Sequence, residues 1–515
     1  MDSKSSKKWP GDHVVELDLR SLATFRILFS LVLILDCLTR WVDATAHYTD
    51  RGLLPRIVLL ESGWHPNFLS LHMMSGEPWF IHALFLIQVA LAICLGLGFR
   101  TRLATALSWF FLISLHNRNP WLLNGGDVYA RVVLFWMLFL PWGQIWSLDA
   151  QQKRSDLRWW MGRLNEEKNS IRSLACVGVL VQVCLVYWFA ALPKDHPSWV
   201  GDYSAIQISL QLDSLVTPFG HAFQGIAAPY LGTLTWMVLM WEALGPFLFW
   251  FPFDRGQTRT MALAVFASLH LGFELCFMIG FFAIYSIVIL VVLLPCWFWD
   301  RPFSRLSVAL DRKLGPQEIC RTKEHPRARK AAESFYLLLI FYVACWNFGN
   351  EQFRPGLWLP DSLDWIGHRL RLDQRWNMFS PSPPYQDGWW VVRGIRRSGK
   401  EVNLTSPGEP ISWEKPENIA GSYLTQRRRR WMMELRSTND ERLMRSYCRY
   451  LVSQINGPNR SLHEVRFVEL YYMLEMTEAD GSERDPVKYK LYEYDHFPVR
   501  PLTPSDVVVP METSP

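Results

Sequence analysis

The sequence predicts an all-α polytopic membrane helical bundle with about nine transmembrane helices, followed by a small soluble α+β domain. Apolar residues make up 50% of the 515-residue chain and charged residues only 20%, which is unusual for a soluble protein of this length. Long apolar windows lie before residue 350, whereas strand-like alternation follows it. Basic residues gather in alternate loops between the windows. Together these three observations predict the two-part architecture.

Nine windows of the sequence are apolar enough for a helix that crosses the bilayer, which takes roughly 20 residues. Only Gly280 separates the seventh window from the eighth, which favours a tight hairpin of antiparallel helices over one long kinked helix. The windows centre on residues 22–40, 79–98, 103–116, 128–146, 173–192, 230–251, 261–279, 281–299 and 334–349.

Lysine and arginine residues test this map, because cytoplasmic loops retain them. If the N-terminus is cytoplasmic, the inside loops carry the basic runs, whereas the outer loop 193–229 holds only Lys194. An odd number of spans then places the C-terminal domain outside. We therefore expect an integral protein of the plasma membrane, or of the inner membrane of a bacterium, with a cytoplasmic N-terminus and an extracytoplasmic C-terminal domain.

The basic start and the apolar run after it also fit a secretory signal peptide, with a cleavage site near residues 44–46. Arg26 and Asp36 interrupt that run and favour a bundle helix with one polar face. The expected division is a cytoplasmic segment at 1–16, a transmembrane bundle at 17–350, an extracytoplasmic α+β domain at 351–500 and a flexible C-terminus at 501–515.

The C-terminal third alternates between apolar and polar residues, as strands with one buried face do. Residues 388–405 predict two strands around the Ser398-Gly399 turn, and residues 464–477 and 488–497 predict one strand each. Residues 430–456 have helical spacing and predict one helix. A small α+β fold follows from this order.

Charge and cysteine content exclude several classes of protein. A formal net charge of +5 gives no reason to expect a nucleic-acid partner, so the lipid bilayer is the expected one. The nine cysteines include no CxxC pair and no readable disulfide framework. A thioredoxin-like redox site and a zinc knuckle are therefore not supported.

Ionisable residues inside the windows are functional candidates, because charges are costly in a bilayer. Asp127 and Arg131 are four residues apart, which favours a local ion pair over a functional role. Arg26 is expected to pair with a carboxylate on a neighbouring helix. His270 and Glu274 have the same spacing and form either an acid/base pair or a structural hydrogen bond. A metal is disfavoured, because no second ligand pair with matching spacing occurs.

Lys194 ends an apolar helix near its outer face. It either extends its ammonium group to the headgroups, the usual behaviour of a terminal lysine, or lies in a desolvated place where a neutral amine can accept a proton. The candidate catalytic residues are thus Lys194, His270 and Glu274.

Five stretches of the sequence form a distinctive series: 47–55 (HYTDRGLLP), 71–76 (LHMMSG), 124–127 (NGGD), 138–143 (LFLPWG) and 187–203 (YWFAALPKDHPSWVGDY). Taken in order, they resemble the HTTM domain, the membrane core shared by vitamin K-dependent γ-glutamyl carboxylase and its bacterial relatives. The resemblance covers about residues 17–299, and residues 375–390 resemble the tails of bacterial members.

The resemblance implies a membrane enzyme that uses a reduced quinone or a vitamin K-like hydroquinone. In the carboxylases, a lysine at the place that aligns with Lys194 deprotonates the hydroquinone, whereas their histidine aligns with Gly126. The missing histidine argues against true glutamate carboxylation. The alternative is a non-enzymatic assembly or export factor whose tail binds an extracytoplasmic polypeptide. A quinone-linked electron carrier and a transporter rank lower, because redox signatures and an internal repeat are missing.

Overall fold

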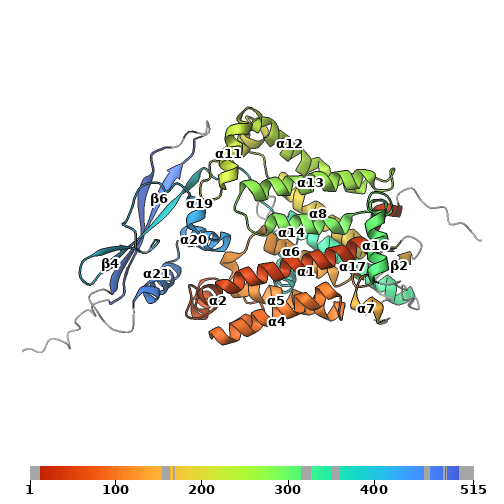
Figure 1. Cartoon of the computed structure of the whole chain (residues 1–515), viewed down its shortest axis with the longest axis horizontal. Helices are drawn as coiled ribbons and strands as arrows, with labels where there is room; N and C mark the ends of the chain where they lie inside the picture. The colour runs from red at the N-terminus through yellow and green to blue at the C-terminus, as the bar shows by residue number, and fades with distance from the viewer. Residues whose placement is uncertain are drawn as a thin grey trace, which may run out of the picture.

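The computed structural model describes residues 12–152, 163–165, 169–314, 326–349, 359–406, 408–456, 464–478, 482 and 484–497. Most of the expected segment 1–16, all of 501–515 and the expected boundary at residue 350 lie outside these residues. The described chain forms a helical bundle with a small sheet at one end (Figure 1).

Each predicted window holds a helix in the described residues. Local sequence explains several of the ends: Pro78 opens α4, Gly98 closes it at φ 67°, and Asn124 caps α6 together with Asp127. The helices are α1 Leu19–Val42, α4 Pro78–Leu97, α5 Thr101–Arg118, α6 Gly125–Met137, α8 Leu174–Ala191, α12 Leu231–Leu244, α13 Gln257–Cys276, α14 Phe282–Leu290 and α17 Pro326–Phe348.

Among the described residues, six segments are long and apolar enough to cross a membrane. They are α1, α4, α8, α13, α17 and Pro218–Trp250, which joins α11 (Pro218–Ala227) to α12. The predicted count of nine is not confirmed, because α6 has only 13 residues, Phe282–Leu293 is short as well, and α5 is not among the six.

Large apolar side chains are exposed on the outer faces of these helices, among them Leu31 and Leu35 on α1, Leu86 on α4 and Phe341 on α17. So much exposed apolar surface is unfavourable in water and suits hydrocarbon. The chain is therefore an integral membrane protein.

The end of the bundle opposite the C-terminal sheet carries a second, very small sheet that the sequence did not predict. Its antiparallel strands run in the order β1 (Glu16–Asp18), β3 (Ser170–Arg172) and β2 (Arg163–Asn165). Strands of three residues are too short to show alternation, so no sequence pattern indicated them.

The C-terminal sheet has the order β5-β4-β6-β7 and is antiparallel throughout. Its strands are β4 (Gln386–Arg396), β5 (Glu401–Asn403), β6 (Val465–Met476) and β7 (Val487–Asp495), which confirms the four predicted strands. The single helix predicted at 430–456 is wrong: α20 (Gln426–Thr438) and α21 (Glu441–Ile455) are separate helices. Asn439 takes a left-handed conformation at φ 48°, and Asp440 caps α21.

An extended segment, 371–385, connects the short helix α18 (Asp361–Leu370) to the sheet and passes through the bundle interior. Leu372 and Trp376 belong to the same apolar core as α1, α6 and α8. Gln374 accepts a hydrogen bond of 2.7 Å from Gln182 on α8, and Trp376 lies 5.6 Å from the ring of Tyr129. The bundle core therefore includes residues beyond the expected boundary.

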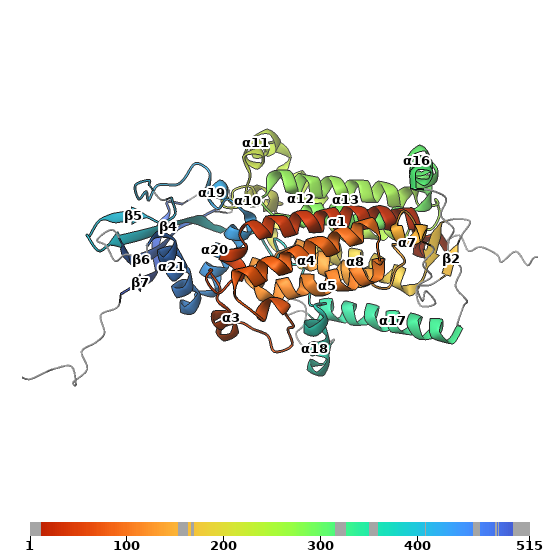
Figure 2. The ribbon, with the colours of Figure 1, turned by 60° about the horizontal axis from the view of Figure 1, so that its bottom comes forward.

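The sheet and its helices are docked on the bundle through polar contacts, with α20 and α21 near the bundle end (Figure 2). Arg427 on α20 donates to Asp36 and to Thr39 on α1, and Ser446 on α21 donates to the carbonyl of Leu53 at 2.8 Å. Asp387 on β4 accepts from the backbone N–H of Ser214 at 2.8 Å. The tail is a folded unit that is attached to the bundle.

Candidate functional site

Lys194 lies just beyond the end of α8, where its N–H donates to the carbonyl of Ala191 at 3.0 Å. Its side chain turns into the protein and is only 5% exposed. The Nζ atom donates to Glu242 Oε2 at 2.5 Å and lies 4.2 Å from the centre of the Trp199 ring. Lys194 is therefore buried, and its ammonium group does not extend to the surface.

Glu242 is the partner that the sequence did not identify. It belongs to α12 and is also 5% exposed, so the two groups form a buried ion pair. Trp199, which covers the amine, is held by a 2.9 Å hydrogen bond from its Nε1 to the carbonyl of Phe379 in the extended segment. Helices α8 and α12 and the extended segment thus meet around one lysine.

A second polar pair lies two helical turns earlier on α8, about 10 Å along the helix axis. The Tyr187 hydroxyl and His270 Nε2 on α13 are 2.9 Å apart and hydrogen-bonded. Aromatic rings surround this pair: Phe266 stacks on Tyr187 at 3.9 Å and lies 5.3 Å from Trp241. His270 Nδ1 and Trp241 Nε1 are buried and lack a hydrogen-bond partner in the structure described.

His270 and Glu274 share α13, but no hydrogen bond joins them in the described structure. His270 points inward to Tyr187, whereas Glu274, one turn nearer the helix end, is half-buried and its Oε2 has no hydrogen-bond partner. The acid/base unit expected from their spacing is therefore not assembled here. Their catalytic roles, and that of Lys194, stay predictions.

Gly126, near the start of α6, has no room for a side chain. A Cβ on Gly126 would lie 2.7 Å from the Cα and 2.9 Å from the N of Phe282 on α14. Real Cβ atoms essentially never approach backbone so closely. The close packing of α6 on α14 therefore depends on glycine at this position.

The end of the bundle next to the C-terminal domain also buries a charge network, in which Arg40 contacts both Asp36 and Asp127. Arg427 from the tail contacts Asp36 in turn. The expected local pair of Asp127 with Arg131 is wrong, because Arg131 bonds to Asp373 at 2.9 Å instead. Asp127 and Arg131 therefore pair with residues that are distant in the sequence and not with each other.

Arg26 corrects a second expectation. No ion pair joins Arg26 to a carboxylate among the described residues, and it donates instead to the backbone carbonyls of Trp142 at 2.8 Å and Ile145 at 3.3 Å. These carbonyls follow the end of α6, where no helical hydrogen bond uses them. A guanidinium group with five N–H donors can satisfy several of them.

Within the described ranges, no group of three or more His, Cys, Asp or Glu side chains is arranged to hold a metal ion. None of the eight described cysteines forms a disulfide. The arrangement around Lys194 suits proton transfer, because a buried amine and a buried carboxylate share one hydrogen bond beside the Trp199 ring.

Comparison with known proteins adds one match. A family model described as the HTTM domain matches residues 15–297, which is more than half of the chain. No curated protein and no solved structure matches the chain.

Proposed function

Because the chain belongs to the HTTM domain family, we propose that it is a membrane enzyme of carboxylase-like architecture that acts on a reduced quinone or a similar lipid-soluble substrate. Lys194 is the base in this proposal. The burial of its amine against Glu242 carries the argument, because a lysine that only anchors a helix end would extend to the headgroups.

The Lys194–Glu242 pair can supply a neutral amine. In a site that excludes water, a charged pair loses hydration on both groups, and moving the shared proton to the carboxylate removes both charges. Lys194 then takes the proton of a substrate hydroxyl, and the Glu242 carboxyl group keeps the pair neutral until that step.

The neighbouring aromatic residues suit a planar ring. Tyr187, Phe266 and Trp241 present stacked and tilted rings on α8, α12 and α13. The buried Trp241 Nε1 is a free donor, and His270 Nδ1 donates or accepts according to its tautomer, so both suit a quinone oxygen.

The proposal does not extend to glutamate carboxylation, because Gly126 leaves no space for the histidine of the carboxylases. The reaction we propose stops at the oxidation of the hydroquinone. One O2 supplies an oxygen atom to the quinone epoxide and an oxygen atom to water, while the hydroquinone gives up its two hydroxyl hydrogens. Lys194 removes the first of these as a proton.

The test uses the purified full chain in lipid nanodiscs with a reduced naphthoquinone and O2, and measures epoxide by mass spectrometry. We expect epoxide from the wild type, none from Lys194→Ala, and wild-type rates from Lys400→Ala, which changes an exposed lysine in the tail. A wild type that forms no epoxide and co-purifies with a polypeptide would contradict the proposal and favour an assembly factor.

We also propose that the N-terminus is cytoplasmic and the tail extracytoplasmic. In support, the start of α1 and the C-terminal sheet lie at opposite ends of the bundle (Figure 1). Ser437 on α20 is exposed, so a Ser437→Cys variant can be labelled with a membrane-impermeant thiol reagent. Labelling of intact cells is expected, and labelling only after the inner face is opened would reverse the orientation.

A further inference from the structure

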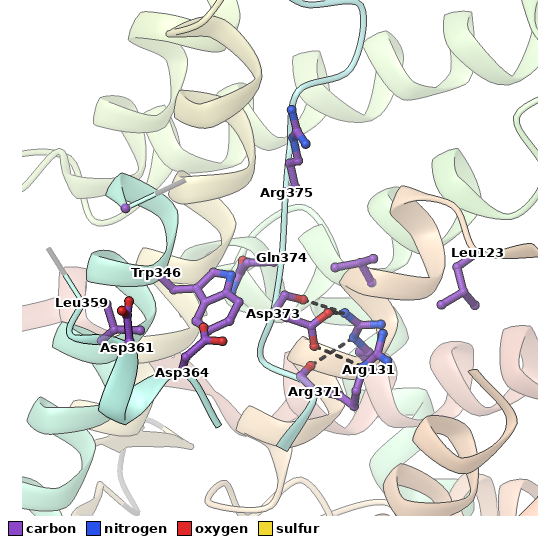
Figure 3. A pocket seen from close by; sticks show the side chains of 12 residues that line it. Leu123, Arg131, Trp346, Leu359, Asp361, Asp364, Arg371, Asp373, Gln374 and Arg375 are labelled. Atoms are coloured by element: carbon purple, nitrogen blue, oxygen red, sulfur yellow. Dashed lines mark hydrogen bonds and ion pairs between the residues drawn. The ribbon is translucent and has the colours of Figure 1, made fainter. Parts of the chain in front are cut away.

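A cavity of about 550 Å³ lies apart from Lys194, where α6, α17, α18 and the start of the extended segment meet. Its apolar lining comes from Leu123, Val128, Trp346 and Leu359. Charged side chains line the rest, with Asp361 and Asp364 on one side and Arg131, Arg371 and Asp373 on the other (Figure 3).

The arginine side of this cavity has an excess of positive charge. Arg131 is 1% exposed and Arg371 is 4% exposed, yet they share one carboxylate, that of Asp373. Asp127, one turn before Arg131, is already occupied by Arg40. Among the residues that the structure describes, two buried cations share one anion here, which leaves a local charge that a ligand can neutralise.

Arg131 also has a free hydrogen-bond donor. Its Nε and Nη2 atoms donate to the Arg371 carbonyl and to Asp373, but its Nη1 is buried and has no hydrogen-bond partner among the described residues. Buried polar groups in proteins are almost always hydrogen-bonded, so an unpaired guanidinium N–H on a side chain that lines the cavity points to an absent acceptor.

The two aspartates on the other side do not cancel this charge. Asp361 is exposed, and the Asp364 side chain is 49% exposed and lies 3.1 Å from His368 Nε2. Water screens charges at such positions, whereas it screens the buried arginines far less. The field inside the cavity therefore favours an anion at Arg131.

The size and lining of the cavity select the kind of anion. A free phosphate would leave most of the 550 Å³ empty, and Val128, Trp346 and Leu359 offer apolar contacts beside the charge. We propose that the cavity binds an anionic amphiphile, whose phosphate or carboxylate headgroup accepts from Arg131 and whose hydrocarbon part packs on these three residues. Both α6 and α17 belong to the bundle, which places the cavity within reach of lipid.

The test measures phosphatidylglycerol retained by the full chain in native mass spectrometry, after reconstitution in mixed phosphatidylcholine–phosphatidylglycerol nanodiscs. We expect Arg131→Gln to lower retention about tenfold, which a lost charge-assisted hydrogen bond would produce. Arg301→Gln, an exposed arginine at the other end of the bundle, is the matched control and should retain the lipid as the wild type does.

If Arg131→Gln does not fold, Val128→Phe is the second variant, because it narrows the cavity beside Arg131 without removing an ion pair, and retention should fall as well. Inorganic phosphate is the second probe. If phosphate alone raised the melting temperature of the wild type but not of Arg131→Gln, and phosphatidylglycerol had no effect, the site would belong to a soluble anion and the amphiphile would be excluded. Equal retention by the wild type and both variants would overturn the proposal.

Discussion

The bundle and the C-terminal sheet each place one arginine between two carboxylates, but in different surroundings. In the bundle, Arg40 contacts Asp36 and Asp127, and its side chain is 1% exposed. In the sheet, Arg393 on β4 contacts Glu401 on β5 and Glu469 on β6, and its side chain is 28% exposed. Both arginines contact two carboxylates, so a comparison of the two regions isolates the effect of burial.

Burial makes each bundle charge depend on its partner. Water replaces a lost partner at the sheet surface but cannot do so inside the bundle. The buried charge network around Arg40 is therefore stable only when every member is present, including Arg427 from the tail. The sheet tolerates the loss of one charge.

The largest effect is expected from Arg40→Met, which leaves Asp127 without its main ion-pair partner in the bundle interior. Removing one partner of a buried pair costs about 3–5 kcal/mol. Thermal unfolding of the detergent-solubilised protein, followed by scanning fluorimetry, measures the loss. An unfolding midpoint within a degree of that of the wild type would show that burial does not determine how much the ion pair contributes to stability.

The next largest loss of stability, about 1–3 kcal/mol, is expected from Gly126→Ala, because the new Cβ meets the backbone of Phe282. Gly125→Ala is the matched control: its Cβ would meet side chains and not backbone, the Phe282 ring at 3.2 Å and Met378 Sδ at 3.6 Å, and side chains can move. The same unfolding assay compares the two variants. Equal losses would mean that close backbone packing at Gly126 is not the cause.

Arg427→Gln tests the contact between the two regions, and we expect a loss of about 1–2 kcal/mol in docking, since the Arg427 side chain is only 12% exposed. Limited proteolysis should release the tail faster than from the wild type. Arg430→Gln controls for the loss of charge, because Arg430 pairs with Glu434 on its own helix. Identical digestion of both variants would show that Arg427 does not stabilise the docking of the tail.

The smallest effect is expected from Arg393→Met, at less than about 1 kcal/mol near pH 7. Burial alone would raise the pKa of Glu469, but hydrogen bonds from Lys490 and Arg393 bring that pKa below its ordinary value. The stabilisation is therefore present above the unfolded pKa of about 4.3 and is lost as the pH falls through the folded pKa. The difference between the unfolding midpoints of wild type and variant should shrink as the pH falls below about 4.3, and a difference that does not change with pH would contradict the ionic origin.

Apolar length and alternation predicted the helices and strands, because both patterns are local. The ion-pair partners were not predictable in this way: Lys194 and Glu242 are 48 residues apart, and Arg40 and Asp127 are 87 residues apart. No local spacing indicates such pairs, and the local alternative for Asp127 was wrong. The break at Asn439 did leave a signal, since Asn tolerates a left-handed conformation and Asp440 is a good helix cap.

The surroundings of Lys194 depend on a segment that the sequence assigned to the soluble domain. Phe379 holds Trp199 over the amine, and the extended segment around it lies in the bundle interior. Its apolar and polar residues do not repeat with a helical or strand period, so periodicity could not place it. Gly126 was noticed only through the resemblance, and its close contact with α14 needed three-dimensional coordinates.

Lys194→Arg tests the central claim most directly, because arginine keeps the positive charge and reach of lysine but does not release its proton. The measurement is the epoxide formation rate of the variant in nanodiscs, together with its unfolding midpoint. If Lys194 is the base, the rate falls to that of Lys194→Ala while the protein stays folded. If Lys194→Arg turns over at the wild-type rate, the residue supplies only a fixed charge for Glu242, and the catalytic assignment is wrong.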